Sequence, residues 1–144
     1  MIASLTGVVD AMNPGEKALI VTANDVGYIV HVSSRDYHVT LLHHPVSLHI
    51  HTILNDKGIS LFGFRSRVEM GIWYKLKSVS KVGPKRALRF LSLDPLHLYT
   101  LIAGKKVENL ATIKGIGAVM AQRVCNELSE WAFIHLSNAN RILS

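Results

Sequence analysis

The sequence contains one cysteine, Cys125, so no disulfide can form within its 144 residues. No apolar run approaches the ~18 residues that a membrane-spanning helix needs. The N-terminus lacks the basic and apolar segments of a secretory signal. Together these absences predict a cytoplasmic protein in a reducing compartment.

Familiar catalytic motifs are also missing. The chain has no GxxxxGK[ST] phosphate loop, no His-Glu-x-x-His zinc motif and no Ser/His/Asp arrangement that its spacing would support. Two of its eight histidines, His49 and His51, share one face of an expected strand, but no cysteine or carboxylate cluster accompanies them. We therefore expect no catalytic residues, no metal and no cofactor, so any ATP hydrolysis must come from a partner protein.

Charged residues are scarce, at 18% of the chain against roughly 25% in typical soluble domains. Such an apolar composition favours buried contacts between subunits. The charges are also divided unevenly: residues 1–64 sum to −2, whereas residues 65–144, with 13 basic and 5 acidic side chains, sum to +8. A basic second half predicts a polyanionic partner, and a solubilising charged surface is the alternative.

The first half of the chain has the pattern of β-strands. Five short segments rich in β-branched and aromatic residues are separated by turn formers. They cover residues 2–9, 17–23, 27–32, 46–54 and 59–64. Alternation puts four apolar residues on one face of the fourth segment: Val46, Leu48, Ile50 and Leu54. We expect a small closed barrel, because closure leaves no exposed strand edges.

The second half has a helical hydrophobic period. A first helix is expected to carry a stripe of four apolar residues: Val68, Ile72, Leu76 and Val79. A second helix should begin at Pro84, and a third should follow the N-cap Asp94 and end at Gly104. A last helix is expected from about Ala118 to Trp131.

Two stretches of the second half resemble each other, "SVSKVGPKRALRFL" (78–91) and "ATIKGIGAVMAQRV" (111–124). Each has a hydrophobic–Gly turn before a helix, and the equivalent Gly83 and Gly117 lie 34 residues apart. Glycine there permits a backbone conformation closed to other residues and lets a phosphate approach without a Cβ in the way. The following helix offers free N–H groups. These tandem helix-hairpin-helix motifs predict phosphate binding that is independent of base sequence.

The order and spacing of these motifs make the chain resemble the RuvA family, the DNA-binding subunits of the bacterial Holliday junction branch migration complex. The resemblance covers nearly the whole chain. Its motifs are "MIASLTGVV" at the start, "DVGYIVHV" (25–32), "LFGF" (61–64), "VGPKRAL" and "GIGAVMAQR". It implies an α+β fold, in which an N-terminal five-stranded OB-type barrel precedes an all-α domain with tandem helix-hairpin-helix motifs.

The resemblance also implies a domain plan and a function. Residues 1–64 would form an OB-fold domain at the core of a homotetramer, and residues 65–135 the DNA-binding domain. Residues 136–144 would be a short tail, too short for the family's third domain, so the chain is either a fragment or a shortened version. The implied function is structure-selective binding of four-way junction DNA, held open for branch migration in recombination and repair. Implied partners are the junction, further copies of the chain as a tetramer or octamer, a RuvB-type hexameric ATPase and a RuvC-type resolvase.

The hairpins supply the DNA-binding residues that the resemblance implies. They are Lys81, Val82, Gly83, Lys85, Lys114, Gly115, Ile116 and Gly117. The family also has an acidic turn, the pin, between its last two barrel strands, and here Asp56 matches one acid whereas Asn55 takes the other position. The family tends to carry a Lys pair where this chain has Ala118 and Val119, and a Gly where it has Lys81. We therefore expect weaker DNA binding than is usual in the family.

Three other interpretations stay open. Helix-hairpin-helix glycosylases place a catalytic Asp beyond their hairpin, whereas no Asp follows Asp94 in this sequence. A second interpretation is a generic binding module without junction preference, which grips duplex DNA by its hairpins or stacks single strands on barrel aromatics such as Tyr28. The third is a structural tetramer that has lost its DNA-binding role.

Overall fold

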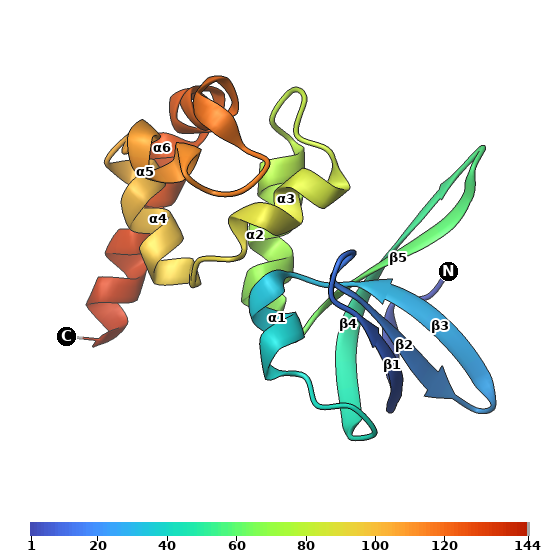
Figure 1. The fold of residues 1–144 in the computed structure, drawn as a ribbon. Coiled ribbons are helices and arrows are strands. Elements are labelled where there is room, and N and C mark those ends of the chain that lie inside the picture. Colours follow the sequence, from blue (N-terminus) through green and yellow to red (C-terminus); the bar gives the residue numbers. More distant parts are fainter. Residues whose placement is uncertain (144) are drawn as a thin grey trace. The chain divides into compact units, whose positions relative to one another are not determined.

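The computed structural model describes residues 1–143, which form two compact units, one from Met1 to Gly71 and one from Ile72 onward. The first contains β1 (Ser4–Asn13), β2 (Ala18–Ala23), β3 (Val26–His31), α1 (Ser34–Val39), β4 (Pro45–Asn55) and β5 (Gly58–Phe64). Helix α2 (Arg67–Lys77) crosses the division, and α3 (Pro84–Phe90), α4 (Pro95–Ala103), α5 (Val107–Ala111) and α6 (Gly117–Leu143) follow. Figure 1 shows this order of strands and then helices, which confirms the predicted α+β fold.

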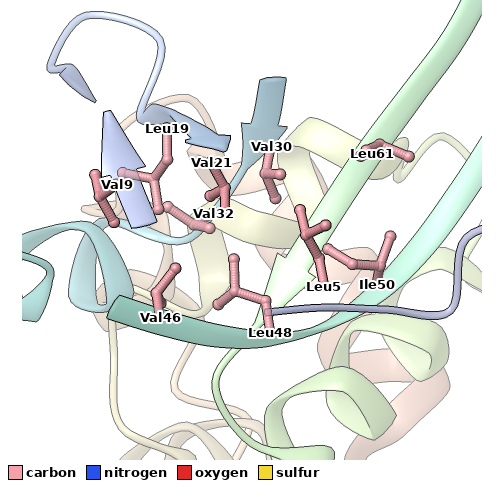
Figure 2. Packing of buried hydrophobic residues seen from close by; sticks show 10 residues of the cluster. All are labelled: Leu5, Val9, Leu19, Val21, Val30, Val32, Val46, Leu48, Ile50 and Leu61. Atoms are coloured by element: carbon pink, nitrogen blue, oxygen red, sulfur yellow. The ribbon is translucent and has the colours of Figure 1, made fainter. Parts of the chain in front are cut away.

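The five strands close into a barrel in the order β1-β2-β3-β5-β4, in which β3 and β5 pair in parallel and the other pairs are antiparallel. This is the predicted OB-type barrel. Its core is apolar, and Figure 2 shows residues of all five strands meeting inside it. They are Leu5, Val9, Leu19, Val21, Val30, Val46, Leu48, Ile50 and Leu61, joined by Val32, which directly follows β3.

The β4–β5 hairpin extends beyond the body of the barrel (Figure 1). Of the four apolar residues on one face of β4, Val46, Leu48 and Ile50 are buried, whereas Leu54 is 74% exposed. Leu54 pairs with Ile59, which is 67% exposed, near the tip of the hairpin. Alternation assigns the face of a strand correctly, but the face becomes a core only where other strands cover it.

Helix α1 was not predicted, although its sequence contains a start signal. The Ser33 hydroxyl oxygen accepts a hydrogen bond from the Asp36 backbone N–H at 3.1 Å, which is a typical N-cap. The helix fills the connection between β3 and β4 and buries Asp36. A serine followed three residues later by an acidic residue is a sequence signature of this arrangement.

The second unit is built around α6, which packs against α4 and α5. Five apolar residues of α6 are buried: Met120, Ala121, Val124, Cys125 and Leu128. The predicted N-cap of α4 is confirmed, because the Asp94 side chain accepts a hydrogen bond from the His97 backbone N–H at 3.0 Å. Among residues 1–143, no helix is both long enough and apolar enough to cross a membrane.

Two expectations for the helices were wrong, and one helix was missed. The buried stripe of α2 begins at Ile72, because Val68 is 55% exposed. Helix α6 continues to Leu143 and does not end near Trp131, since no Gly or Pro interrupts the sequence there. The five-residue helix α5 was missed, because a segment so short carries little periodic signal.

Candidate nucleic-acid interface

Hairpin 1, residues 72–90, consists of the end of α2, a tight turn and α3. The turn is held by the backbone, with the Val82 N–H donating to the Val79 carbonyl at 3.1 Å. Trp73 is fully buried, and its indole N–H donates to the Pro84 carbonyl at 2.9 Å. This bond fixes the start of α3 against α2.

Hairpin 2, residues 107–124, repeats the same geometry with α5, a turn and the beginning of α6. The Ile116 N–H donates to the Ile113 carbonyl at 3.1 Å, which is the equivalent bond 34 residues later. The Thr112 hydroxyl donates to the carbonyl three residues before it at 2.6 Å, and the Ser78 hydroxyl does the same in hairpin 1 at 2.5 Å. The repeat seen in the sequence is therefore a repeat of individual hydrogen bonds.

The glycines of the two turns differ in backbone conformation. Gly117 has φ 72°, a left-handed conformation that favours glycine, as expected. Gly83 has φ −84° and ψ 176°, an extended conformation that any residue adopts, so the expectation of a restricted backbone there was wrong. Gly83 is the N-cap of α3, a position that is normally extended. The left-handed residue of hairpin 1 is Lys81, with φ 73°, which matches Gly115 at 85°.

Open space surrounds both of the repeat-equivalent glycines. A Cβ added to Gly83 or Gly117 would meet no heavy atom within 4 Å outside its two chain neighbours. Internal packing therefore does not require glycine at either position, and at Gly83 the backbone does not require it either. As an N-cap, Gly83 offers no side-chain acceptor to the first-turn amides of α3. The space leaves room for an external anion to approach these backbone amides.

The other predicted DNA-binding residues fall into two groups. Lys81, Lys85 and Lys114 are exposed and present their charges at the surface. Val82 and Ile116 are only 5% and 8% exposed, so their side chains belong to the core. These two residues can therefore contact a ligand only through their backbone. A turn with a buried apolar anchor and exposed lysines suits a phosphate group, which accepts hydrogen bonds and carries negative charge.

Two arginines that the sequence reasoning missed join the hairpins. Arg89, on α3, donates through Nη1 to the Lys114 carbonyl of hairpin 2 at 3.2 Å. Arg123, on α6, donates through Nη1 to the Ser80 carbonyl of hairpin 1 at 3.3 Å. Both donors and both acceptors are 34 residues apart. The repeat offset was the signal that could have found them.

The predicted pin lies at the tip of the β4–β5 hairpin. The Asn55 side-chain oxygen accepts a hydrogen bond from the Lys57 N–H at 2.9 Å, so Asn55 closes the turn. Asp56 is exposed at the tip, beside the exposed Lys57. Gly58, which ends the turn, has φ 120°. The tip therefore presents one carboxylate and one ammonium group.

The outer surface of the barrel carries apolar side chains on three adjacent strands. On β1, β2 and β3, Val8, Ile20, Val26 and Ile29 are 37% to 60% exposed. Ile20 and Ile29 are direct cross-strand partners. This part of the barrel surface is therefore apolar.

Other chemistry is limited in the part of the chain that the structure describes. No group of three or more His, Cys, Asp or Glu residues lies close enough there to hold a metal ion. Cys125 is buried, and burial raises the pKa of its thiol above the usual value, which disfavours the reactive thiolate. Burial likewise lowers the pKa of Lys77, whose ammonium group lies 4.3 Å from the centre of the Trp73 ring.

Comparison with protein families gives two matches that divide the chain between them. Residues 1–63 match the model described as the RuvA N terminal domain. Residues 74–130 match the model described as a SAM-like helix-hairpin-helix tandem. The second match contains both turns described above.

Curated relatives match across the join between these segments. Proteins of Geobacter sulfurreducens and Pelobacter propionicus are 40% and 37% identical to the chain over 132 and 131 residues. Each alignment covers 90% of this chain and 65% of the relative. A protein of Thermosipho melanesiensis is 31% identical over 131 residues, which is 68% of its length. All three are named Holliday junction branch migration complex subunit RuvA, and the chain spans about two thirds of their length.

Proposed function

Because the chain belongs to the RuvA family, we propose that it is a noncatalytic subunit that binds four-way junction DNA independently of base sequence. The observation that carries this proposal is the pair of equivalent hairpins, each with a glycine whose Cβ side faces open space. A phosphate carries no sequence information, so a site built from backbone amides and lysines reads the shape and charge of DNA. The charge of +8 on residues 65–144 supports the same ligand.

We also propose that four copies assemble through the barrel, with residues 1–64 at the centre and residues 65–135 as the DNA-binding region. The exposed Val8, Ile20 and Ile29 support this assembly, because an apolar patch on a barrel surface is stabilised when a second copy covers it. Closed rotational symmetry would give each arm of a four-way junction an equivalent pair of hairpins.

The hairpin tip is proposed to act at the crossover of the junction. The Asp56 carboxylate would repel phosphates there, and the neighbouring Lys57 would weaken that repulsion. Leu54 and Ile59 flank the turn and add an apolar surface next to the carboxylate. This tip is therefore a weaker electrostatic wedge than one that carries two acids.

The partners follow from the same proposal. A RuvB-type hexameric ATPase would supply the energy for branch migration, and a RuvC-type resolvase would act on the bound junction, in DNA recombination and repair. The relatives that match are named as subunits of a branch migration complex. The proposal includes an octamer, in which two tetramers bind opposite faces of one junction.

A generic duplex-binding module is the second candidate function. Hairpin phosphate sites alone would bind any duplex, and junction preference requires several copies in a fixed arrangement. This candidate would be favoured if the chain were monomeric at the concentrations at which it binds DNA.

A titration of a synthetic four-way junction against a linear duplex of equal length tests the proposal. We expect a preference for the junction, equal affinity for junctions of different base sequence, and an affinity that falls as salt rises. Equal affinity for junction and duplex would support the second candidate. Failure to bind either DNA would overturn both.

A further inference from the structure

We infer that Arg89 and Arg123 are positioning residues. Each donates a hydrogen bond to the phosphate-binding turn of the other hairpin and thereby orients that turn. This inference rests on the proposed function of the hairpins as phosphate sites. Arg89 belongs to hairpin 1 by sequence but bonds to the turn of hairpin 2 at Lys114, and Arg123 does the reverse at Ser80. The exchange is reciprocal, because donors and acceptors occupy equivalent positions of the repeat.

Each arginine binds a carbonyl that directly precedes the left-handed residue of its turn. The carbonyls belong to Ser80 and Lys114, and the left-handed residues are Lys81 and Gly115. A trans peptide bond is planar, so its carbonyl and its N–H point in opposite directions. By holding the oxygen on one side, the arginine aims the N–H of the next residue away from itself. The hydrogen bond to the oxygen also polarises the peptide group and makes that N–H a stronger donor.

Packing at hairpin 2 supports the same role. A Cβ added to Gly115 would lie 2.8 Å from the Cδ and Nε atoms of Arg89, so the arginine side chain lies directly against this glycine. Two features therefore favour glycine at position 115. One is its left-handed φ of 85°, and the other is the Arg89 side chain, which leaves no room for a Cβ. A side chain at this position would displace the arginine from the Lys114 carbonyl.

Direct contact of the arginines with DNA is the alternative, and the salt dependence of binding separates the two roles. A residue that neutralises a phosphate contributes about 0.9 to the slope of log K against log salt, whereas a residue that only orients a turn contributes nothing. We would measure junction affinity at several salt concentrations for Arg89→Met, Arg123→Met and a control, Arg86→Met. Arg86 is an exposed arginine of the same helix as Arg89, so its replacement removes the same charge.

We expect Arg89→Met and Arg123→Met each to lower junction affinity roughly 3- to 10-fold, as the net contribution of one ordinary hydrogen bond predicts, with the salt slope of the wild type. Arg86→Met should lower affinity less. If either positioning variant lost about 0.9 of the salt slope, it would be a phosphate contact and the inference would be overturned. Unchanged affinity would overturn it as well.

Double variants give a stricter test, because they ask which hairpin each arginine serves. Arg89→Met would be combined with Gly117→Ala, which blocks hairpin 2, and with Gly83→Val, which blocks hairpin 1. We expect the effect of Arg89→Met to shrink when hairpin 2 is already blocked and to persist when hairpin 1 is blocked. The pattern for Arg123→Met should be the reverse. If each arginine instead coupled to its own hairpin, the exchange of support would be refuted.

Amide hydrogen exchange tests the inference without DNA, so its failure is distinguishable from failure of the proposed function. In the free protein, Arg89→Met should accelerate exchange at Ile116, whose N–H closes the turn of hairpin 2, and leave Val82, which closes the turn of hairpin 1, unchanged, and Arg123→Met should do the opposite. Melting temperatures would show whether the fold is retained. Equal acceleration throughout the second unit would mean that the arginines only stabilise the fold. Loss of DNA binding by the wild-type protein would overturn the proposed function alone.

Discussion

Hairpins 1 and 2 share a backbone plan but differ in the chemistry that they present. The turn hydrogen bond from Val82 to Val79 recurs between Ile116 and Ile113 with the same length. Hairpin 1 has a lysine in its left-handed position, whereas hairpin 2 has Gly115 there. A repeat can therefore keep the same hydrogen bonds in both copies while one copy presents more charge and the other presents mainly its backbone.

The helices that follow the turns extend this difference. Helix α3 continues from Pro84 with the exposed Lys85, which adds its charge to that of Lys81 in the turn. Helix α6 begins with Ala118 and Val119, and Val119 is 75% exposed. Hairpin 1 should therefore bind phosphate with a large electrostatic contribution, and hairpin 2 mainly through its backbone.

Blocking hairpin 1 should produce the largest effect. Gly83→Val introduces a β-branched side chain where the extended backbone accepts it and where no internal atom is in the way. The melting temperature should fall by no more than a few degrees, because Val is a poorer N-cap than Gly, whereas junction affinity should fall roughly 10-fold or more, as loss of a charge-assisted hydrogen bond predicts. The control is Gly71→Ala, another glycine with open space around it, on α2. Unchanged affinity of Gly83→Val would break the assignment of this turn as a phosphate site.

Adding charge to hairpin 2 should make the two hairpins more alike. The double variant Ala118→Lys and Val119→Lys puts two ammonium groups beside the turn, so junction affinity should rise several-fold at low salt. The salt slope should become steeper by about 0.9 for each new phosphate contact. Phe133→Lys and Ile134→Lys provide the control, since these exposed residues lie on the same helix about 20 Å further along. Equal gains in both double variants would mean that the added charge acts without regard to position.

Lys81 offers a smaller test, because it combines backbone strain with charge. A non-glycine residue in the left-handed region costs on the order of 1–2 kcal/mol, so Lys81→Gly should raise stability. The same change removes a charge from the turn, so affinity should fall slightly and the salt slope should drop by about 0.9. Lys105→Gly is the matched control, since Lys105 has φ 50° but lies outside both turns. A stability gain without any change in salt slope would remove Lys81 from the DNA-binding residues.

Much of the architecture was predictable because its signals are local. Strand alternation identified the barrel, Pro84 and Asp94 identified helix starts, and the glycine spacing identified the repeat. The φ of Gly83 was not predictable, since glycine is compatible with both the extended and the left-handed conformation. The bonds of Arg89 and Arg123 were harder still to predict, because the 34-residue offset marks the two arginines as equivalent but does not say which carbonyl each one bonds.

The two hairpins also differ in how their first helices begin. Helix α2 begins beside two buried acids, Asp36 and Glu69. The Asp36 carboxylate accepts a hydrogen bond from the Arg65 N–H at 3.2 Å, and Glu69 Oε1 accepts one from the Ser66 hydroxyl at 3.3 Å. Glu69 Oε2 is buried without a donor among residues 1–143. Burial first, and then the charge of Asp36, raise the pKa of Glu69 from 4.5 to about 7, while the charge of Arg35 opposes the rise.

The raised pKa predicts the smallest effect and its direction. Between pH 4.5 and about 7 the folded protein holds a proton on Glu69 that the unfolded chain has released, so stability falls as pH rises through this range. Glu69→Gln cannot titrate, and its amide can donate to Asp36 at any pH. The melting temperature of the variant relative to the wild type should therefore rise by a few degrees between pH 5 and pH 8, at about 2–4 °C per kcal/mol. Glu108→Gln, at the exposed first-turn acid of α5, should give a curve parallel to the wild type. Parallel curves for Glu69→Gln as well would mean that the start of α2 is no more sensitive to pH than the start of α5.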